Sequence, residues 1–366
     1  MILIYCLCGS VCLYVLFTIY FTIGLHRLKI YKKKELLPTI TIVVAARNEE
    51  SNVQQLLKSL VEQDYPNEKM EIVIVSDRST DGTWQIINDF SNLYPFVKGI
   101  KLEDINDDMT PKKHALTCGI KNSSGEIILS TDGDCLAPKG WARSMVSSFG
   151  DNTGIVVGRS SINLSKQSFF NYYQSIDFLG IMAANAGVIG WKKGWSGSGQ
   201  NIAYKRNAFE KINGFNPVAK AVSGDDMYLV QSISKNYNIH FNADPSSFIY
   251  TEPVESIKAF FNQRIRWASN SRNLWETNLF FLFFLIIAFL SNSIFIIAIW
   301  SKELLPILLS LFIIKIISDG LVLYTGSIKL NVPFKKIHFL SWSIFQPIYI
   351  PITGILGLLG WFRWKE

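Results

Sequence analysis

Cysteine and histidine are scarce in this chain, which contains five cysteines and four histidines. Only Cys118 and Cys135 lie in the polar middle of the sequence, so no disulfide framework is indicated, as is usual in a reducing compartment. His114 and His240 have no histidine or cysteine partner at ligand spacing, which argues against a zinc site built from imidazole and thiolate. Cys135 is interpreted as a packing residue.

Charge is missing from Ile2 to Leu25, a segment long enough to cross a bilayer. A basic tract follows this segment, with Arg27, Lys29, Lys32, Lys33 and Lys34. In a signal peptide the positive charge precedes the apolar core. The reverse order seen here predicts an uncleaved anchor whose C-terminal end is cytosolic.

Charge is also sparse near the other end, where three apolar segments predict three more spans. They are Leu279 to Trp300, Leu304 to Tyr324 and Phe339 to Trp361. Lys302 and Glu303 lie in the first gap between them. The second gap is basic, as expected of a cytosolic loop, with Lys329, Lys335 and Lys336.

Two details of these segments leave alternatives open. Pro347 and Pro351 interrupt the last one, which either spans the membrane, re-enters it or lies along its surface. Lys315 and Asp319 lie four residues apart in an apolar helix, where unpaired charges are costly. They predict either a structural salt bridge or a polar lining for an acceptor head group.

The net charge of +7 is gathered beside the apolar segments, so the sequence favours contact with membrane lipids over nucleic acid. A transporter is disfavoured because the polar residues lie outside the spans and no helix pattern repeats.

The middle of the chain, from about Pro38 to Arg272, reads as a globular domain. Runs typical of buried strands alternate there with helical segments, which predicts an α/β fold with a mostly parallel sheet. The runs are Thr39 to Ala46, Glu71 to Val75, Gly99 to Leu102 and Glu126 to Ser130. Polar residues follow each run, at the edge where such sheets bind ligands.

The fourth run leads into Asp132-Gly133-Asp134. If the strand continues through these residues, both carboxylates point the same way, and Gly133 lets the backbone approach a ligand. Two hard oxygen ligands suit Mg²⁺ or Mn²⁺ holding a substrate diphosphate. The same tripeptide is also ordinary turn chemistry, and by itself it favours a turn.

From Pro38 to about Trp267 the chain resembles family 2 glycosyltransferases of the GT-A fold, because several of their motifs occur in order. The first are Ala46-Arg47-Asn48-Glu49, Ser76-Asp77, Asp81-Gly82-Thr83, Lys112-x-x-Ala115-Leu116 and Asp132-Gly133-Asp134. Gly197-Ser198-Gly199-Gln200-Asn201 resembles the family's acceptor-side loop. Gly224-Asp225-Asp226 with Leu229 resembles its Glu-Asp-x-x-Leu motif, with Asp225 in place of the usual glutamate.

One further motif, Gln263-x-x-Arg266-Trp267, is similar to the signature of membrane-embedded members. These include cellulose, chitin and hyaluronan synthases and ceramide glucosyltransferases. The resemblance implies a cytosolic GT-A domain with flanking transmembrane helices, in an integral protein of a cell inner membrane. The expected parts are an anchor (1–26), a basic linker (27–37), the GT-A domain (38–253), an amphipathic interfacial helix (254–276) and a C-terminal region of about three membrane helices (277–366).

The resemblance also implies a set of residues that bind a nucleotide diphosphate sugar, with UDP the family's commonest nucleotide. Asp134 would be the direct metal ligand, with Asp132 on the metal, ribose or sugar. The other donor-binding residues are Glu49, Asp77, Lys112, Gln263 and Arg266. From the residues alone, Asp77 is also a candidate helix cap, Glu49 a candidate solvated residue, and Lys113 a candidate in place of Lys112.

Asp226 is the expected general base, which takes the acceptor proton as the hydroxyl attacks. Direct attack with one base implies inversion, and hence a β-linkage from an α-linked donor. Asp225 and Trp267 are expected on the acceptor side, where Trp267 offers a flat face for stacking. Two plainer alternatives remain, namely a turn or helix cap at Gly224 and Asp225, and an interfacial helix without chemistry around Trp267.

The acceptor is expected to be a membrane-associated lipid or glycan. A lipid is slightly favoured, because the chain has fewer candidate spans than synthases that export a polymer through their own helices. A processive polysaccharide synthase is the alternative, and a homo-oligomer is left open. A non-catalytic sugar-binding or scaffolding membrane protein is a third hypothesis, but such a protein is expected to have lost its base or a metal ligand.

Overall fold

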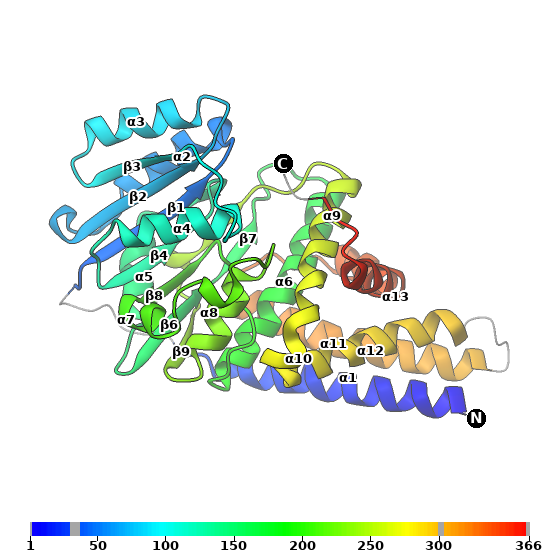
Figure 1. Ribbon diagram of the computed structural model, residues 1–366. Helices are drawn as coiled ribbons and strands as arrows, with labels where there is room; N and C mark the ends of the chain where they lie inside the picture. The colour runs from blue at the N-terminus through cyan, green and yellow to red at the C-terminus, as the bar shows by residue number, and fades with distance from the viewer. Residues whose placement is uncertain (1, 30–36, 299–303, 364–366) are drawn as a thin grey trace. The chain divides into compact units, whose positions relative to one another are not determined.

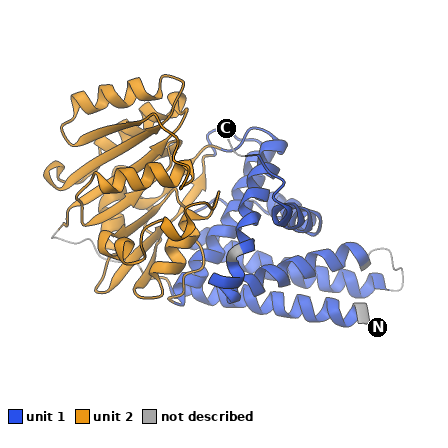
Figure 2. Ribbon diagram, viewed as in Figure 1, with its two compact units in different colours: residues 1–27, 164–191, 253–366 blue, residues 28–163, 192–252 orange. Residues whose placement is uncertain are grey.

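A computed structural model describes residues 2–29, 37–298 and 304–363. The chain forms two compact units (Figure 2). We call residues 28–163 and 192–252 the sheet unit, and residues 1–27, 164–191 and 253–366 the helical unit. Most of the predicted basic linker, and both Lys302 and Glu303, lie outside the described residues.

The sheet unit is built on a seven-stranded sheet with the order β3-β2-β1-β4-β8-β6-β9 (Figure 1). Strands β1 to β4 are parallel, β8 is antiparallel to both of its neighbours, and β9 is parallel to β6. The strands are β1 (Ile40–Ala46), β2 (Met70–Asp77), β3 (Val97–Leu102), β4 (Ile127–Ser130), β6 (Thr153–Gly158), β8 (Ile202–Lys205) and β9 (Asn238–Asn242). The predicted α/β class and mostly parallel sheet are confirmed.

Helices cover both faces of this sheet because successive strand residues point to opposite sides. On one face, β1 residues such as Ile42 pack with buried leucines of α2 (Glu50–Val61) and with residues of α3 (Thr83–Leu93) and α5 (Trp141–Ser147). On the other face, Val73 and Val75 of β2 pack against α4 (Pro111–Lys121). Burial on both faces explains why these strands read as unbroken β-branched runs.

A second, three-stranded sheet lies at the end of the Asp132-Gly133-Asp134 segment. Its order is β5-β10-β7, formed by Cys135–Leu136, Ile249–Thr251 and Ser160–Ile162. Two short helices complete the unit, α7 (Arg206–Lys211) and α8 (Asp225–Ile233).

Among its described residues, the helical unit contains four helices that are long and apolar enough to cross a membrane. They are α1 (Ile2–His26), α11 (Leu279–Ala298), α12 (Leu305–Lys329) and α13 (Lys336–Leu359). The expected interruption of the last segment is wrong, because Pro347 and Pro351 lie inside one continuous helix. The unit also contains α6 (Phe169–Gly190), α9 (Ile257–Ser269) and α10 (Leu274–Thr277).

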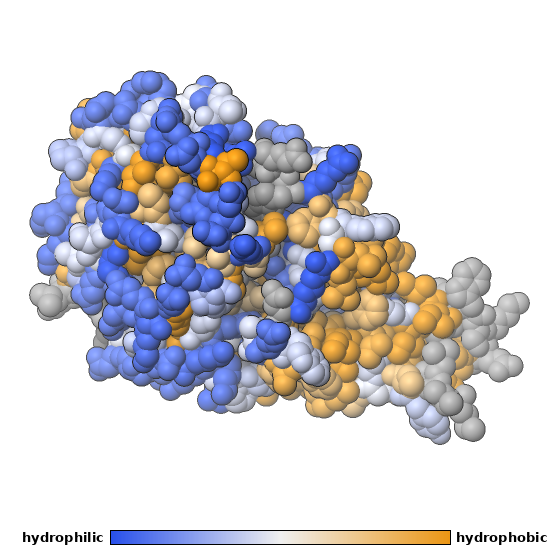
Figure 3. All heavy atoms as spheres, in the orientation of Figure 1, coloured by the Kyte–Doolittle hydropathy of each residue, from blue (hydrophilic) through white to orange (hydrophobic). Residues whose placement is uncertain are grey.

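The surface of the helical unit is strongly apolar on the visible face, whereas the sheet unit is mostly hydrophilic (Figure 3). Leu279, Ile317 and Leu358 are each more than half exposed. Exposed apolar area on this scale is unusual for a soluble surface and is expected of helices that face lipid.

One segment of the predicted GT-A domain groups differently from the rest. Residues 164–191, which contain α6, belong to the helical unit, although the prediction placed them inside residues 38–253. The predicted domain boundaries stay predictions.

Lys315 and Asp319 form an ion pair inside the helical unit. Lys315 Nζ lies 2.8 Å from Asp319 Oδ2, and both side chains are almost fully buried. The Tyr14 hydroxyl of α1 donates to Asp319 Oδ1 at 2.7 Å. These contacts support the structural salt bridge, since they satisfy both charges within the protein. A lining for an acceptor head group stays a prediction.

Glycines allow α1 and α6 to cross in backbone contact. A Cβ atom on Gly24 would lie 1.8 Å from the Gly187 carbonyl oxygen, and one on Gly190 would lie 1.9 Å from the Gly24 carbonyl oxygen. Such distances are impossible for real atoms, so any side chain at these positions must push the helices apart. Small residues at a crossing of this kind are a common feature of membrane helix packing.

We therefore expect Gly24→Ala to destabilise the helical unit by about 1–3 kcal/mol, the usual cost of overpacking. Thermal unfolding of the detergent-solubilised protein measures this as a lower midpoint. Gly9→Ala is the matched control on the same helix, because a Cβ there would have no neighbour within 4 Å. Equal destabilisation by both variants would contradict the prediction.

Candidate active site

Lys112 lies among three carboxylates contributed by distant parts of the sheet unit. Its Nζ lies 2.7 Å from Asp132 Oδ1 and 3.8 Å from Asp225 Oδ2. Burial lowers the pKa of Lys112, but the nearby charges of Asp132, Asp225 and Asp226 outweigh this and raise it. Lys112 is therefore a fixed cation in a cluster whose formal charge is negative.

Lys113 does not share this position. Its Nζ donates to the Ala221 carbonyl oxygen, in the segment that precedes Asp225. The structure thus places Lys112, rather than its neighbour, in ion pairs with the carboxylates.

Asp226 is held by main-chain amides at the start of α8. Gly199 N donates to its Oδ2 at 3.0 Å, and Met227 N donates to its Oδ1 at 2.7 Å. The start of a helix favours a carboxylate. Burial and the adjacent Asp225 carboxylate raise the pKa of Asp226 to about 6. The Gly224–Asp225 turn alternative is compatible with this geometry, because Gly224 has a left-handed backbone with φ of 84°.

Gly199 lies in the glycine-rich loop that precedes the acids. A Cβ atom at this position would lie 3.6 Å from Lys112 Nζ and 3.8 Å from atoms of both Asp225 and Asp226. The loop therefore borders the cluster, and its amide donates directly to a carboxylate.

Asp132, Gly133 and Asp134 form a turn rather than the end of a strand. Strand β4 ends at Ser130, and Cys135 N donates to the Asp132 carbonyl oxygen at 3.2 Å. The expectation of a continued strand is wrong, and the turn alternative describes the backbone correctly. Cys135 Sγ lies 3.6 Å from Asp134 Oδ1 and is buried, so it packs beneath the turn.

Glu49 follows β1 and contacts the start of α3 and the turn that follows β4. Its amide donates to Thr83 Oγ1 at 2.8 Å, and its side chain lies against the position a Gly133 Cβ would occupy. Asn52 Nδ2 donates to Glu49 Oε2 at 2.8 Å. The solvated alternative for Glu49 is therefore disfavoured.

Asp77 is buried and paired with its neighbour in sequence. Arg78 donates from Nε and Nη2 to the two carboxylate oxygens of Asp77, at 2.8 Å and 3.1 Å. Asp77 is not a cap of α3, since Asp81 instead accepts from Thr83 N at 3.0 Å. The sequence analysis missed Arg78, which adds a cation at the end of β2.

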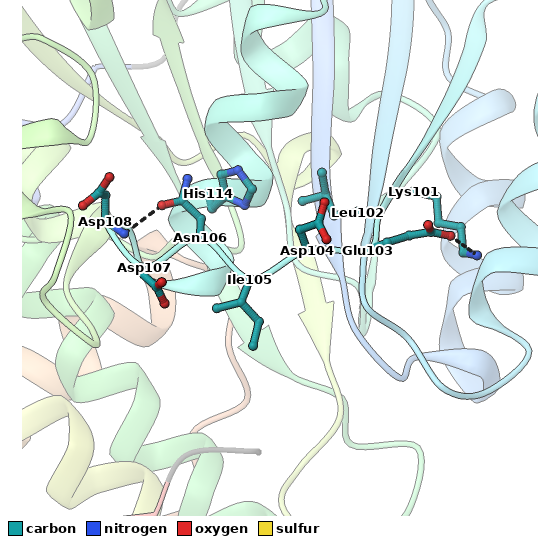
Figure 4. A pocket seen from close by; sticks show the side chains of 9 residues that line it. All are labelled: Lys101, Leu102, Glu103, Asp104, Ile105, Asn106, Asp107, Asp108 and His114. Carbon is teal, nitrogen blue, oxygen red and sulfur yellow. Dashed lines mark hydrogen bonds and ion pairs between the residues drawn. The ribbon is translucent and has the colours of Figure 1, made fainter.

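An open pocket of about 680 Å³ lies at the carboxyl end of β3 (Figure 4). Its lining is acidic and includes Glu103, Asp104, Asp107 and Asp108. The lining also contains Lys101 and His114. None of the residues expected to bind the donor lines this pocket.

Gln263, Arg266 and Trp267 lie on α9 of the helical unit, in the region predicted to be an interfacial helix. Ser256 caps this helix by accepting from Ala259 N at 3.1 Å. Trp267 packs near Phe178 of α6, with ring centroids 5.9 Å apart.

Comparison with known proteins decides the family. A family model described as glycosyl transferase family 2 matches residues 41–213, and one described as glycosyl transferase family group 2 matches residues 128–352. The chain is a family 2 glycosyltransferase. The matched ranges include the Lys112 cluster and the Gln263-x-x-Arg266-Trp267 motif of this glycosyltransferase.

Two curated relatives illustrate the range of the family. A poly-beta-1,6-N-acetyl-D-glucosamine synthase of Staphylococcus epidermidis is 27% identical over 65% of this chain and 57% of its own length. A beta-monoglucosyldiacylglycerol synthase of Synechocystis is 26% identical over 63% of this chain and 47% of its own. The chain spans about half the length of the curated relatives it matches.

A solved structure has the same fold. The mannosyltransferase PcManGT from Pyrobaculum calidifontis, in complex with GDP-Man and Mn²⁺, is 18% identical and covers 98% of this glycosyltransferase and 99% of its own chain, with a TM-score of 0.60.

If Asp226 is the general base expected from the sequence, its raised pKa predicts how sugar transfer depends on pH. A carboxyl group must be ionised to accept a proton, so kcat/KM should be full well above pH 6. It should fall about tenfold for each unit below that value. A pH profile of nucleotide release measures this. Asp225→Asn removes the negative charge that raises the pKa of Asp226, so the acid limb of the pH profile should move to lower pH. An unmoved acid limb would contradict the assignment of Asp226 as the general base.

Proposed function

We propose that this chain is a membrane-bound, inverting glycosyltransferase that moves a sugar from a nucleotide diphosphate sugar to a membrane-associated acceptor. The observation that carries the proposal is the cluster in which Lys112 contacts Asp132 and Asp225, beside an Asp226 carboxylate fixed by two amides. Lys112 and Asp132 are proposed to interact with the departing diphosphate. Asp226 is proposed to accept the proton of the acceptor hydroxyl.

Asp226 is proposed as the general base. Its two amide donors fix the carboxylate, and a pKa of about 6 keeps it ionised at neutral pH while leaving it basic enough to accept a proton. Attack by the deprotonating hydroxyl on the anomeric carbon displaces the diphosphate in one step, which inverts the configuration. An α-linked donor, proposed to carry UDP, then gives a β-linked product.

Asp134 and Asp132 are proposed to hold a divalent cation, Mg²⁺ or Mn²⁺. Lys112 donates to Asp132 Oδ1, and Asp132 Oδ2 is proposed to coordinate the cation. The described residues contain no group of three or more protein ligands, so oxygens of the donor diphosphate would complete the shell. Such a cation, when bound, offsets the charge that develops on the leaving diphosphate.

The remaining donor contacts are assigned by role. Asp77, with Glu49 nearby, is proposed to bind the base or ribose, and Arg266 and Gln263 to bind the diphosphate. Arginine suits this task because its guanidinium can donate two parallel hydrogen bonds to a phosphate. Trp267 and Asp225 are proposed on the acceptor side.

The protein is proposed to lie in a cell inner membrane with its catalytic domain in the cytosol. Four apolar helices support the membrane location. Arg27 and Lys29 after α1, and Lys335 and Lys336 before α13, support the orientation, since cytosolic loops are enriched in basic residues. No role for nucleic acid is proposed, and homo-oligomerisation stays open.

A lipid acceptor is slightly favoured over a growing glycan. One relative is named for a glycolipid product and another for a polymer, so the family admits both. The deciding experiment is a screen of nucleotide sugars with the purified protein in lipid, followed by mass spectrometry of the product. We expect a single added sugar on a lipid. A ladder of masses would favour the processive synthase, and no nucleotide release with any donor would overturn the proposal.

A further inference from the structure

A buried ion pair joins α6 to α9 in the helical unit. Arg264 Nε lies 2.6 Å from Asp177 Oδ2, and the two side chains are only 4% and 5% exposed. From α13, Trp342 Nε1 donates to Asp177 Oδ1 at 3.0 Å, and the Tyr349 hydroxyl donates to Asp177 Oδ2 at 3.4 Å. Asp177 therefore receives hydrogen bonds from two helices at once.

Arg264 also contacts two residues of the Gln263-x-x-Arg266-Trp267 motif, of which it is not a defining member. Its Nη1 donates to Gln263 Oε1, and its guanidinium carbon lies 4.2 Å above the centre of the Trp267 ring. The same carbon lies 4.5 Å from the centre of the Phe260 ring. The guanidinium thus contacts two aromatic rings and donates hydrogen bonds from Nε and Nη1.

This arrangement requires the shape of arginine. A planar guanidinium can stack on a ring and still donate in its own plane in more than one direction, whereas an ammonium is a point charge on a flexible stem. An ion pair as buried as this one adds little stability on average compared with apolar residues of similar volume. The ion pair is better explained by its effect on side-chain orientation. Asp177 fixes Arg264, which in turn contacts Gln263 and Trp267.

We propose that Arg264, anchored by Asp177, is a positioning residue that sets the orientation of Gln263 and Trp267 for sugar transfer. The inference rests on the proposed function, in which these two residues bind the donor and the acceptor. Arg264 itself touches neither substrate. It restricts the rotamers of the two residues that do, and so lowers the cost of ordering them in the transition state.

Arg264→Lys is the direct test, because it keeps the charge that Asp177 needs and removes the planar group. We expect kcat to fall about tenfold with a smaller rise in the donor KM, because Gln263 contacts the donor while the orientation of both residues matters most in the transition state. In a Trp267→Ala background, Arg264→Lys should reduce kcat by a much smaller factor, because the Trp267 side chain that Arg264 orients is already absent. Equal factors in both backgrounds would overturn the proposal.

A second readout needs no turnover. The difference between the fluorescence spectra of wild type and Trp267→Phe isolates the Trp267 emission, and Arg264→Lys should shift it because the stacked cation is lost. An unshifted Trp267 component would overturn the proposal even if no donor were ever found. Failure of the proposed function would instead appear as absent transfer in the wild type, so the two failures are distinguishable.

Two further variants guard against a purely structural effect. Arg206→Lys is the matched control, because Arg206 donates to the Gly125 and Ile120 carbonyl oxygens in the sheet unit. Its effect on kcat should be the same with and without Trp267→Ala. If Arg264→Lys does not fold, the neutral pair Asp177→Asn with Arg264→Gln removes both charges together. That pair should show the same dependence on Trp267, and independence of Trp267 would overturn the proposal.

Discussion

Asp226→Asn should lower kcat by about 10²–10⁴-fold, the usual contribution of a positioned general base. Asparagine keeps the size of the side chain, but its single carbonyl oxygen can accept from only one of the two amides, because Gly199 N and Met227 N donate to different oxygens of Asp226. It cannot take a proton from the acceptor hydroxyl. The donor KM should change little, because Asp226 is proposed to act on the acceptor. Initial rates of nucleotide release with saturating donor and acceptor measure both quantities.

The matched control for this experiment is Asp225→Asn, one residue earlier on the same helix. Asp225 lies 3.8 Å from Lys112 Nζ and is proposed to contact the acceptor without removing its proton. Its replacement should cost markedly less than that of Asp226. A larger loss at Asp225 would transfer the role of base to that residue, and equal small losses at both would count against any carboxylate base in this cluster.

Asp134→Asn should have the second largest effect, on the response to divalent cations. Loss of a charged oxygen ligand weakens the site, and the stabilisation that a metal gives a developing phosphate charge is several kcal/mol. We therefore expect transfer to fall by about 10²–10³-fold at a fixed low Mn²⁺ concentration, since each 1.36 kcal/mol corresponds to a factor of ten. Titration with Mn²⁺ or Mg²⁺ should recover part of the loss at higher concentration.

Asp151→Asn is the control for this titration, because Asp151 is an exposed aspartate in a turn of the same unit. Its metal response should match that of the wild type. An unchanged metal response in Asp134→Asn, or full activity of the wild type in the presence of a chelator, would exclude Asp134 as a required ligand.

The candidate site was partly predictable because short motifs encode local backbone geometry. Asp132-Gly133-Asp134 was placed after a strand from its sequence alone, and the turn was one of its two predicted conformations. The pairing of Lys112 with Asp132 and Asp225 was not predictable from spacing, since these residues are separated by other strands and helices. The Gly199 amide was missed for the same reason, because only the folded chain brings it near Asp226. Arg78 is different, since its partner Asp77 is the preceding residue and no motif singled Arg78 out.

The sequence by itself determined the class of this protein. Unbroken β-branched runs indicate the strands, uncharged runs indicate the membrane helices, and the order of motifs indicates the family, because each of these signals depends on residues near one another in the chain. Only the tertiary structure decided that Lys112 rather than Lys113 pairs with the acids, that Pro347 and Pro351 lie within one helix, and that Arg264 pairs with Asp177. Those outcomes depend on which surfaces, far apart in sequence, pack against one another. Close packing in the interior is determined by the whole chain rather than by any local segment.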